Sequence, residues 1–432
     1  MFNGIKGSGF AVAALMFASL SMTQPAFAEN DAVTVEAGEG AQDRLLEALI
    51  MAQPGQTIRL GAGTFALTDG LSLDVDNVTV EGAGMEQTIL SFKGQETGAE
   101  GFLITSDNVT LKGFAVEDAK GDAVKSKGAD NIKFIGIRTE WTNGPDEKNG
   151  AYGLYPVESK NILIDGCVAI GASDAGIYVG QSSHIVVRNS IARYNVAGIE
   201  IENSFHADVY QNIATHNTGG ILVFDLPGLP QVGGHTVRVF RNAITNNNTA
   251  NFAPKGNIVA GVPAGTGVII MANKNVHLFE NVIGGNNSTN VLVSAYSRAD
   301  SAAQDAAEQQ AATASNDAFI PVPRDVFLYR NALGEAGTKP SGTIAALAPV
   351  IDGPMPSILW DGVTAYRDGD DMREVDVNLV IHENVGNTSF ANFGFATTET
   401  DRTNPKVSMD ISAHAGAIPD TVDVTFTGVQ AE

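Results

Sequence analysis

Three segments of this chain repeat one short pattern at a fixed spacing. The segment that begins at Asp174 (DAGIYV) recurs 22 residues later at Val196 (VAGIEI) and again 22 residues later at Thr218 (TGGILV). Between them, the run Ile185–Asn189 (IVVRN) recurs 23 residues later as Asp208–Asn212 (DVYQN). A period in the low twenties, with β-branched runs and Gly or Asn corners, predicts a coiled β-solenoid. Equivalent positions of successive coils then stack in a line, so side chains distant in sequence become neighbours.

The same spacing places strands along most of the chain. Within each predicted strand alternate residues are apolar, as the two-residue period of a strand requires. The clearest strand starts are Asn77, Asn108, Asn131, Asn161, His184, Ala207, Thr236 and Asn275. Insertions interrupt the period at 142–152, 225–235 and 246–266. Ala41–Ala52 has helical apolar spacing before Pro54-Gly55, and a helix there would cover the open end of the solenoid.

The expected organisation follows from these signals. Lys6, an apolar stretch from Phe10 to Leu20 and Ala26-Phe27-Ala28 predict a signal peptide (1–28) that is cut after Ala28, and hence a periplasmic or secreted protein. No later stretch is long and apolar enough for a membrane span. The remaining divisions are an N-terminal cap with the first coil (29–66), coils (67–298), an Ala/Gln-rich insertion (299–323), further coils interrupted at 332–374 (324–384), and a C-terminal cap (385–432).

Charge and cysteine content restrict the function classes. The formal net charge is −23 at pH 7, whereas binding to nucleic acid phosphates requires a basic face. We therefore expect no nucleic acid partner, and the lack of a long apolar stretch predicts no membrane insertion. The single cysteine, Cys167, lies inside a predicted coil and cannot form an internal disulfide. It is interpreted as a small buried apolar residue.

Two columns of asparagine mark the predicted corners. Asn tolerates left-handed backbone conformations, and its amide can bond to the Asn of the next coil. We expect these residues to be ladder residues and not ligands. One column contains Asn189, Asn212, Asn242, Asn281, Asn331 and Asn384, and the other contains Asn195 and Asn217, followed by Asn247 or Asn287.

These patterns resemble the right-handed parallel β-helix proteins of the pectate-lyase-like superfamily. The entry PGQTIRL at Pro54, followed by Gly63-Thr64-Phe65, is similar to their N-terminal coil. Strings such as Gly153–Val157 (GLYPV) and Asn251–Asn257 (NFAPKGN) are similar to an exported β-helix repeat family without an established activity. The resemblance covers roughly residues 40–385. It implies an all-β, single-stranded right-handed parallel β-helix with an N-terminal capping helix.

The resemblance transfers little chemistry. The fold accommodates lyases, hydrolases, epimerases and proteins that are not enzymes. The sequence also lacks the N-T-D, G-H-G, R-I-K and D-P-H-D patterns of pectin-hydrolysing and alginate-epimerising relatives. The usual sites of those enzymes are therefore not expected in their usual form.

Aligning the coils on the glycines predicts one outward strip of side chains. The residue after each glycine is apolar and points inward, and the next residue points outward. This outward position holds Lys125, Tyr155, Tyr178, Glu200, Leu222 and Ile269, and two residues further along it holds Lys127, Val157, Gly180, Glu202 and Phe224. Asp225 lies next to the second position. The three insertions are expected to rise beside this strip and to form a groove.

The strip contains the candidate functional residues. Tyr155 and Tyr178 would stack on sugar rings, with Lys125 and Asp225 as further substrate contacts. Glu200 and Glu202 lie on one side of one strand, roughly 6–7 Å apart, and are the candidate catalytic acid and base for a polysaccharide lyase, glycosidase or epimerase-like reaction. The alternative is that these residues form an ordinary solvated face.

No metal ligands or cofactors are identified from the sequence. His184 and His206 fall on adjacent coils without a third ligand. Ca²⁺ is possible at Asp74-Val75-Asp76 or Asp368–Asp371, although both lack the full spacing of a calcium loop.

Three functions stay open from the sequence. The first is an exported β-helix that binds or processes a polysaccharide, with or without catalysis. The second is a non-catalytic scaffold that binds another exported protein. The third is a maturation factor that handles a metal.

Overall fold

The computed structural model describes residues 32–297, 319–400 and 404–421. The expected signal peptide (1–28) and most of the expected insertion 299–323 lie outside these residues. No helix of the described residues is long and apolar enough to cross a membrane.

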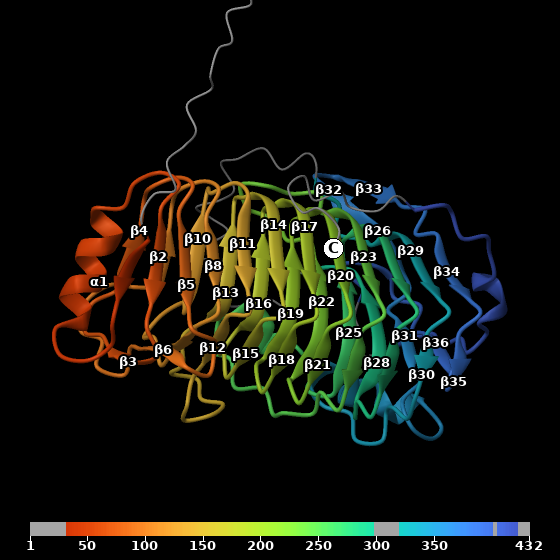
Figure 1. Ribbon diagram of the computed structural model, residues 1–432. Coiled ribbons are helices and arrows are strands. Elements are labelled where there is room, and N and C mark those ends of the chain that lie inside the picture. Colours follow the sequence, from red (N-terminus) through yellow and green to blue (C-terminus); the bar gives the residue numbers. More distant parts are fainter. Residues whose placement is uncertain (1–31, 298–318, 401–403, 422–432) are drawn as a thin grey trace, which may run out of the picture.

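The described chain coils into three parallel sheets, and each full coil contributes one strand to each sheet (Figure 1). The first sheet consists of β1 (Val33–Val35), β2 (Thr57–Leu60), β5 (Thr79–Gly82), β8 (Thr110–Lys112), β11 (Ile132–Ile135), β14 (Lys160–Asp165), β17 (Ser183–Arg188), β20 (Phe205–Tyr210), β23 (His235–Phe240), β26 (Lys274–Phe279), β29 (Arg324–Tyr329) and β34 (Leu379–His382). The predicted parallel β-helix is therefore confirmed.

The second sheet carries the predicted strip, and the third sheet closes each coil. The second sheet consists of β4 (Leu71–Leu73), β7 (Phe102–Ile104), β10 (Val124–Lys127), β13 (Tyr152–Val157), β16 (Ala175–Gly180), β19 (Ala197–Glu202), β22 (Gly219–Phe224), β25 (Thr266–Met271), β28 (Thr289–Ser294), β31 (Ile358–Trp360) and β36 (Phe390–Asn392). The third consists of β3 (Gly63–Ala66), β6 (Thr88–Ser91), β9 (Ala115–Glu117), β12 (Arg138–Glu140), β15 (Val168–Ile170), β18 (Ile191–Arg193), β21 (Ile213–Thr215), β24 (Ala243–Thr245), β27 (Val282–Gly284), β30 (Ala332–Leu333) and β35 (Val385–Gly386).

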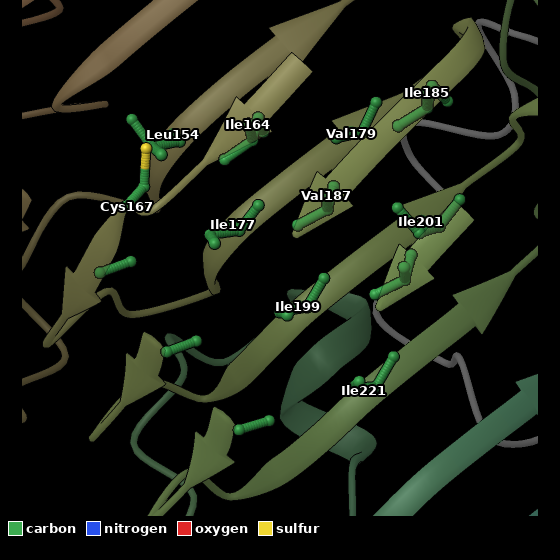
Figure 2. Close-up of a cluster of buried hydrophobic side chains, with 14 of the residues drawn as sticks. Leu154, Ile164, Cys167, Ile177, Val179, Ile185, Val187, Ile199, Ile201 and Ile221 are labelled. Atoms are coloured by element: carbon green, nitrogen blue, oxygen red, sulfur yellow. The ribbon is translucent and has the colours of Figure 1, made fainter. Parts of the chain in front are cut away.

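The interior of the coil is filled by stacked aliphatic side chains. Register pairs Leu154 with Ile177, Ile177 with Ile199, and Ile199 with Ile221, and all four are fully buried. Figure 2 shows these columns facing the side chains of the opposite sheet across the interior. Each such side chain contributes roughly 1.5–3 kcal/mol through its removal from water. The repeat observed in the sequence is therefore the repeat of this core.

Cys167 belongs to the same interior. It is a free, fully buried thiol that contacts the Phe134 carbonyl oxygen at 3.3 Å. Burial raises the pKa of this thiol to about 12. The residue is therefore a core side chain, as expected, and its thiol stays protonated.

Asparagine ladders form at two corners, and in each of them one residue differs from the prediction. In one corner Asn212, Asn242, Asn281 and Asn331 each donate a side-chain hydrogen bond to the next Asn of the column, which ends at Asn384. Asn189 does not belong to this column, because Ser190 occupies that position and Asn189 is exposed and bonds to Asp165. In the other corner the ladder runs through Asn195, Asn217, Asn247 and Asn286, so Asn287 is not a member.

Both ends of the solenoid are covered. The predicted N-terminal helix is present as α1 (Ala41–Ile50), which buries Leu45 and Leu49 at the red end of Figure 1. At the other end the turn η4 (Ser412–His414) places the His414 ring 4.8 Å from the Phe390 ring, measured between centroids.

The C-terminal divisions differ from those expected. The interval 332–374 contains the coil strands β30 and β31, and the segment 385–392 contains β35 and β36, so the solenoid continues through both. Between β30 and β31 lie α3 (Gly342–Leu347) and the turn η3 (Ala348–Val350). A small sheet of β32 (Val363–Asp368), β33 (Asp371–Glu374) and β37 (Ala396–Thr397) follows. The coil strands β30, β31, β35 and β36 have only two or three residues each, and such short strands leave little periodicity in a sequence.

Candidate functional site

The predicted strip exists in the predicted register. Lys125 pairs with Tyr155, Tyr178 with Glu200, and Glu200 with Leu222 on adjacent strands of the second sheet. Two residues along, Gly180 pairs with Glu202 and Glu202 with Phe224. The repeat therefore located these neighbours correctly from sequence alone.

The strip is roofed over β16, β19 and β22, where an open groove was expected. The insertion 246–265, which includes the turn η1 (Ile258–Gly261), places Val259 and Val262 in one buried cluster with Tyr178, Leu222 and Phe224. As a result, Tyr178, Glu200 and Glu202 are only 4%, 1% and 8% exposed. The insertion forms a roof because its apolar side chains lose contact with water there.

Small residues on the sheet make room for this roof. Ala175, Ala197 and Gly219 are register partners at the start of their strands. A Cβ at Gly219 would lie 3.1 Å from Val262 Cγ1, which is tighter than an ordinary contact. Inside the loop, Asn251 Nδ2 donates to the Val259 carbonyl at 2.8 Å and to the Val262 carbonyl at 2.9 Å. The loop therefore has its own polar support as well as an apolar seat.

Glu200 and Glu202 meet directly under the roof. The two side chains hydrogen-bond to each other, so they are closer than the roughly 6–7 Å expected from strand rise alone. The Tyr178 hydroxyl donates to Glu202 Oε1 at 2.6 Å. The Tyr178 ring reaches Glu202 because it lies over Gly180, where an added Cβ would be 2.4 Å from the hydroxyl oxygen. Glu200 Oε2 is buried and accepts no hydrogen bond from the described residues.

Burial raises the pKa values of both carboxyl groups. Desolvation, followed by the charges of Glu202 and Asp174, raises the pKa of Glu200 well above its usual range. Desolvation raises the pKa of Glu202 to about 7, although hydrogen bonds from Tyr178 and Glu200 oppose the rise. A protonated Glu200 that donates to an ionised Glu202 explains why their hydrogen bond raises the pKa of Glu200 and lowers that of Glu202. Pairs of carboxyls that share one proton behave in this way.

Asp174 is a third member that the sequence reasoning missed. It is 7% exposed, and its Oδ2 accepts a hydrogen bond of 3.2 Å from Asn257 Nδ2 in the roof. Desolvation and the Glu202 charge raise the pKa of Asp174 to about 8. A signal was available, because Val196 and Thr218 stand at the same position of the repeat. A carboxylate in a column that is otherwise neutral marks a special environment.

Three tyrosines connect this buried cluster to the surface. The Tyr152 ring centroid lies 4.3 Å from that of Tyr155 and 4.5 Å from that of Tyr178. Tyr152, which the sequence reasoning also missed, and Tyr155 are both partly exposed. Burial raises the pKa of each of the three phenols, so all three stay protonated. The tyrosines therefore form a continuous aromatic path from solvent to Glu202.

Lys125 borders the exposed end of the tyrosines. Its ammonium lies 4.8 Å from the Tyr155 ring centroid and 3.2 Å from both Glu100 Oε1 and Asp122 Oδ2. The Lys125 pKa is raised: desolvation lowers it, but the Asp122 and Glu100 carboxylates outweigh that effect. This end of the strip is a partly exposed patch of aromatic rings, one cation and two carboxyl groups.

Asp225 lies close to Glu202 but has a structural role. Its carboxylate accepts hydrogen bonds from the backbone N–H groups of Gly233 (3.0 Å) and Gly234 (2.8 Å), which closes the insertion 225–235. It is fully buried, and desolvation raises its pKa to about 6. Its charge acts on Glu202 through space.

Within the described part of the chain, no three His, Cys, Asp or Glu side chains are arranged to hold a metal ion. The His184 and His206 rings do meet, with centroids 5.4 Å apart. Asp74 accepts a hydrogen bond from the Thr105 hydroxyl, and Asp76 accepts one from the Asp107 amide, so both serve turns between coils.

A comparison with family models agrees with the architecture. A family model described as a right-handed beta helix region matches residues 70–232. The chain is a right-handed parallel β-helix. None of the curated proteins matches it in sequence.

Solved structures with a similar fold include three proteins that act on polysaccharides, by their names. The A-module of mannuronan C-5 epimerase AlgE4 from Azotobacter vinelandii is 14% identical, with a TM-score of 0.48 over 84% of this chain and 96% of that one. The family 28 exopolygalacturonase from Yersinia enterocolitica is 12% identical (TM-score 0.48; 83% and 77% covered). The catalytic unit of the GH87 alpha-1,3-glucanase from Streptomyces thermodiastaticus is 15% identical (TM-score 0.45; 84% and 56% covered).

Proposed function

We propose that this β-helix is an exported carbohydrate-active protein that binds a polysaccharide at the exposed end of its tyrosine cluster. The observation that carries the proposal is the hydrogen bond from Tyr178 to the Glu202–Glu200 pair, at the buried end of an aromatic path that begins at the surface. A binding surface and a proton-holding carboxyl pair are thereby joined by one set of side chains.

The exposed patch has the chemistry that a sugar requires. The partly exposed rings of Tyr152 and Tyr155 offer apolar faces for a pyranose ring, and their hydroxyl groups offer hydrogen bonds. Glu100 and Asp122 can accept hydrogen bonds from sugar hydroxyl groups, while Lys125 holds both carboxylates in place.

Catalysis, in this proposal, falls to Glu200 and Glu202. Burial raises both pKa values, that of Glu202 to about 7, and a pair that shares one proton provides an acid and a base near neutral pH. The roof 246–265 covers both groups, so the reaction requires that this loop moves when a sugar chain binds. Binding alone does not require that movement, because Tyr152 and Tyr155 are already accessible.

Binding is tested by affinity electrophoresis against a panel of neutral and acidic polysaccharides. We expect retardation by at least one polysaccharide and an affinity about tenfold lower for Tyr155→Ala, since one aromatic contact is worth up to about 1.5 kcal/mol. The matched control is Tyr194→Ala, which removes a tyrosine that is 40% exposed and lies after β18 of the third sheet. No retardation, or equal loss in both variants, would contradict the proposal.

The second candidate is a non-catalytic scaffold that holds another exported protein. The observation in its favour is the roof itself, because the chain's own loop occupies the face above Glu200 and Glu202. The double variant Glu200→Gln/Glu202→Gln separates the two candidates. Full cellular function in that variant favours the scaffold, whereas loss of function with an intact fold favours the carboxyl pair.

A further inference from the structure

A hollow lies further along the outer face of the second sheet, beyond the roof. It has a volume of about 720 Å³, which is within the range of small-molecule sites. Ile269, Leu292 and Leu359 of β25, β28 and β31 form its floor. The far side of the roof at Val262 and α3 at Ile344 form its walls.

The apolar floor follows from the sequence of the strip. The outward column that holds Tyr178 and Glu200 on β16 and β19 continues as Leu222, Ile269, Leu292 and Leu359 on the next strands. Outward apolar side chains are unfavourable unless something covers them. The roof and α3 cover part of this face, but Leu292 and Met271 stay partly exposed where they line the hollow. Apolar surface is therefore available to a ligand.

The charged groups of this pocket select the kind of ligand. Lys255 is the one Lys or Arg among the described lining residues; it is exposed, and no carboxylate of the described chain lies within 4.0 Å of its ammonium. The one carboxylate among them, Asp361, accepts the backbone N–H groups of Ala295 (2.8 Å) and Val363 (3.1 Å). Asp361 is thus engaged by the fold, and the charge open to a ligand is positive.

We propose that this pocket binds a single alkyl or acyl chain that carries an anionic head group, with the chain on Ile269, Leu292 and Leu359 and the head group at Lys255. The hydrophobic effect supplies the affinity, and Lys255 supplies the preference for an anion over a neutral head group. The proposal is independent of the polysaccharide function, because it uses none of the tyrosines or buried carboxyl groups of that site.

Calorimetric titration with dodecanoate and with dodecanol, both below the concentration at which they aggregate, tests the proposal. We expect one saturable site for dodecanoate and about tenfold weaker binding of dodecanol. Lys255→Glu should weaken dodecanoate binding about tenfold and leave dodecanol binding unchanged. Leu292→Trp, which fills the pocket, should abolish binding of both.

Two further variants keep the test decisive. Val282→Trp adds the same bulk at an exposed position of the third sheet (56% exposed) and should bind like the wild type. Ala346→Trp narrows the pocket from the exposed side of α3, so it replaces Leu292→Trp if that variant fails to fold. The proposal is overturned if dodecanoate shows no saturable binding, or if the pocket-filling variant and Val282→Trp behave alike.

Discussion

Replacing Glu200 with glutamine is expected to change how the stability of this protein depends on pH. Glu200 is 1% exposed, and its neighbours Glu202 and Asp174 are also acids with raised pKa values. The folded protein therefore keeps protons that the unfolded chain releases at its ordinary glutamate pKa of about 4.3. Stability from this source is complete at pH values below about 4, and it is lost progressively as the pH rises towards the folded pKa values.

The size of the effect follows from proton linkage. Each proton held by the folded state alone lowers the free energy of unfolding by about 1.4 kcal/mol per pH unit. A proton that Glu200 keeps throughout the interval from pH 5 to pH 7 lowers the free energy of unfolding by at most about 3 kcal/mol, because the structure relaxes around a buried charge. Glutamine removes this proton and still offers an amide N–H to Glu202. The Glu200→Gln variant should thus lose stability less steeply over this range, by about 1.4 kcal/mol per pH unit, and be more stable than the wild type at pH 7.

Urea unfolding at pH 5, 6, 7 and 8 measures this slope, and infrared spectroscopy of the carboxylic acid C=O band counts the protonated groups in the folded state. The control is Glu147→Gln, which changes an exposed glutamate in the insertion 142–152. Equal slopes for wild type and Glu200→Gln, or an unchanged infrared band at pH 6.5, would show that the buried cluster does not hold its protons as argued.

Two other substitutions test the parts of the fold that support the site. Asn242→Ala removes four side-chain hydrogen bonds of a buried ladder, which join Asn242 to Asn212, Val209 and Asn281. Urea titration should show a free energy of unfolding that is lower by about 2–4 kcal/mol. The control Asn189→Ala, at an exposed position outside the ladder, should change this free energy by less than about 0.5 kcal/mol. Gly180→Ala should displace the Tyr178 ring from Glu202, which would lower the thermal unfolding midpoint and alter the titration of Glu202. The control Gly261→Ala, which has no atom within 4 Å of the added Cβ, should leave the midpoint and the titration unchanged.

The repeat predicted the register of the strip because the core dictates that register. Ile177, Ile199 and Ile221 must all point inward, so a slip of one residue would expose a whole apolar column. Tyr178, Glu200 and Leu222 are fixed as outward neighbours by the same argument. Backbone register does not determine the rotamer of each side chain. The direct contact between Glu200 and Glu202 was therefore not predictable from strand geometry.

The roof was not predictable from the repeat, because an insertion obeys no period. The sequence places the insertion 246–266 before β25, but the side on which it lies depends on whether its own apolar residues find a matching surface. Val259 and Val262 find one over the small residues Ala197 and Gly219. A column of small outward residues beside an insertion that contains apolar residues such as Val259 and Val262 is the signal that would have predicted a roof where a groove was expected.

The roof also separates two chemically different halves of one continuous face. On β13 to β19 this face carries Tyr155, Tyr178, Glu200 and Glu202, and on β22 to β31 the same column continues as Leu222, Ile269, Leu292 and Leu359. The loop contacts both halves, because Asn257 donates to Asp174 while Val262 and Lys255 line the apolar pocket. Asn251 and the buried valines hold this loop in place, but the unfilled apolar space on its far side removes packing contacts that would stabilise the closed position. The acids add to this, because ionisation of Asp174 or Glu202 beneath the roof raises the cost of keeping it closed. The roof is therefore the element whose displacement would open the carboxyl pair and reshape the pocket together.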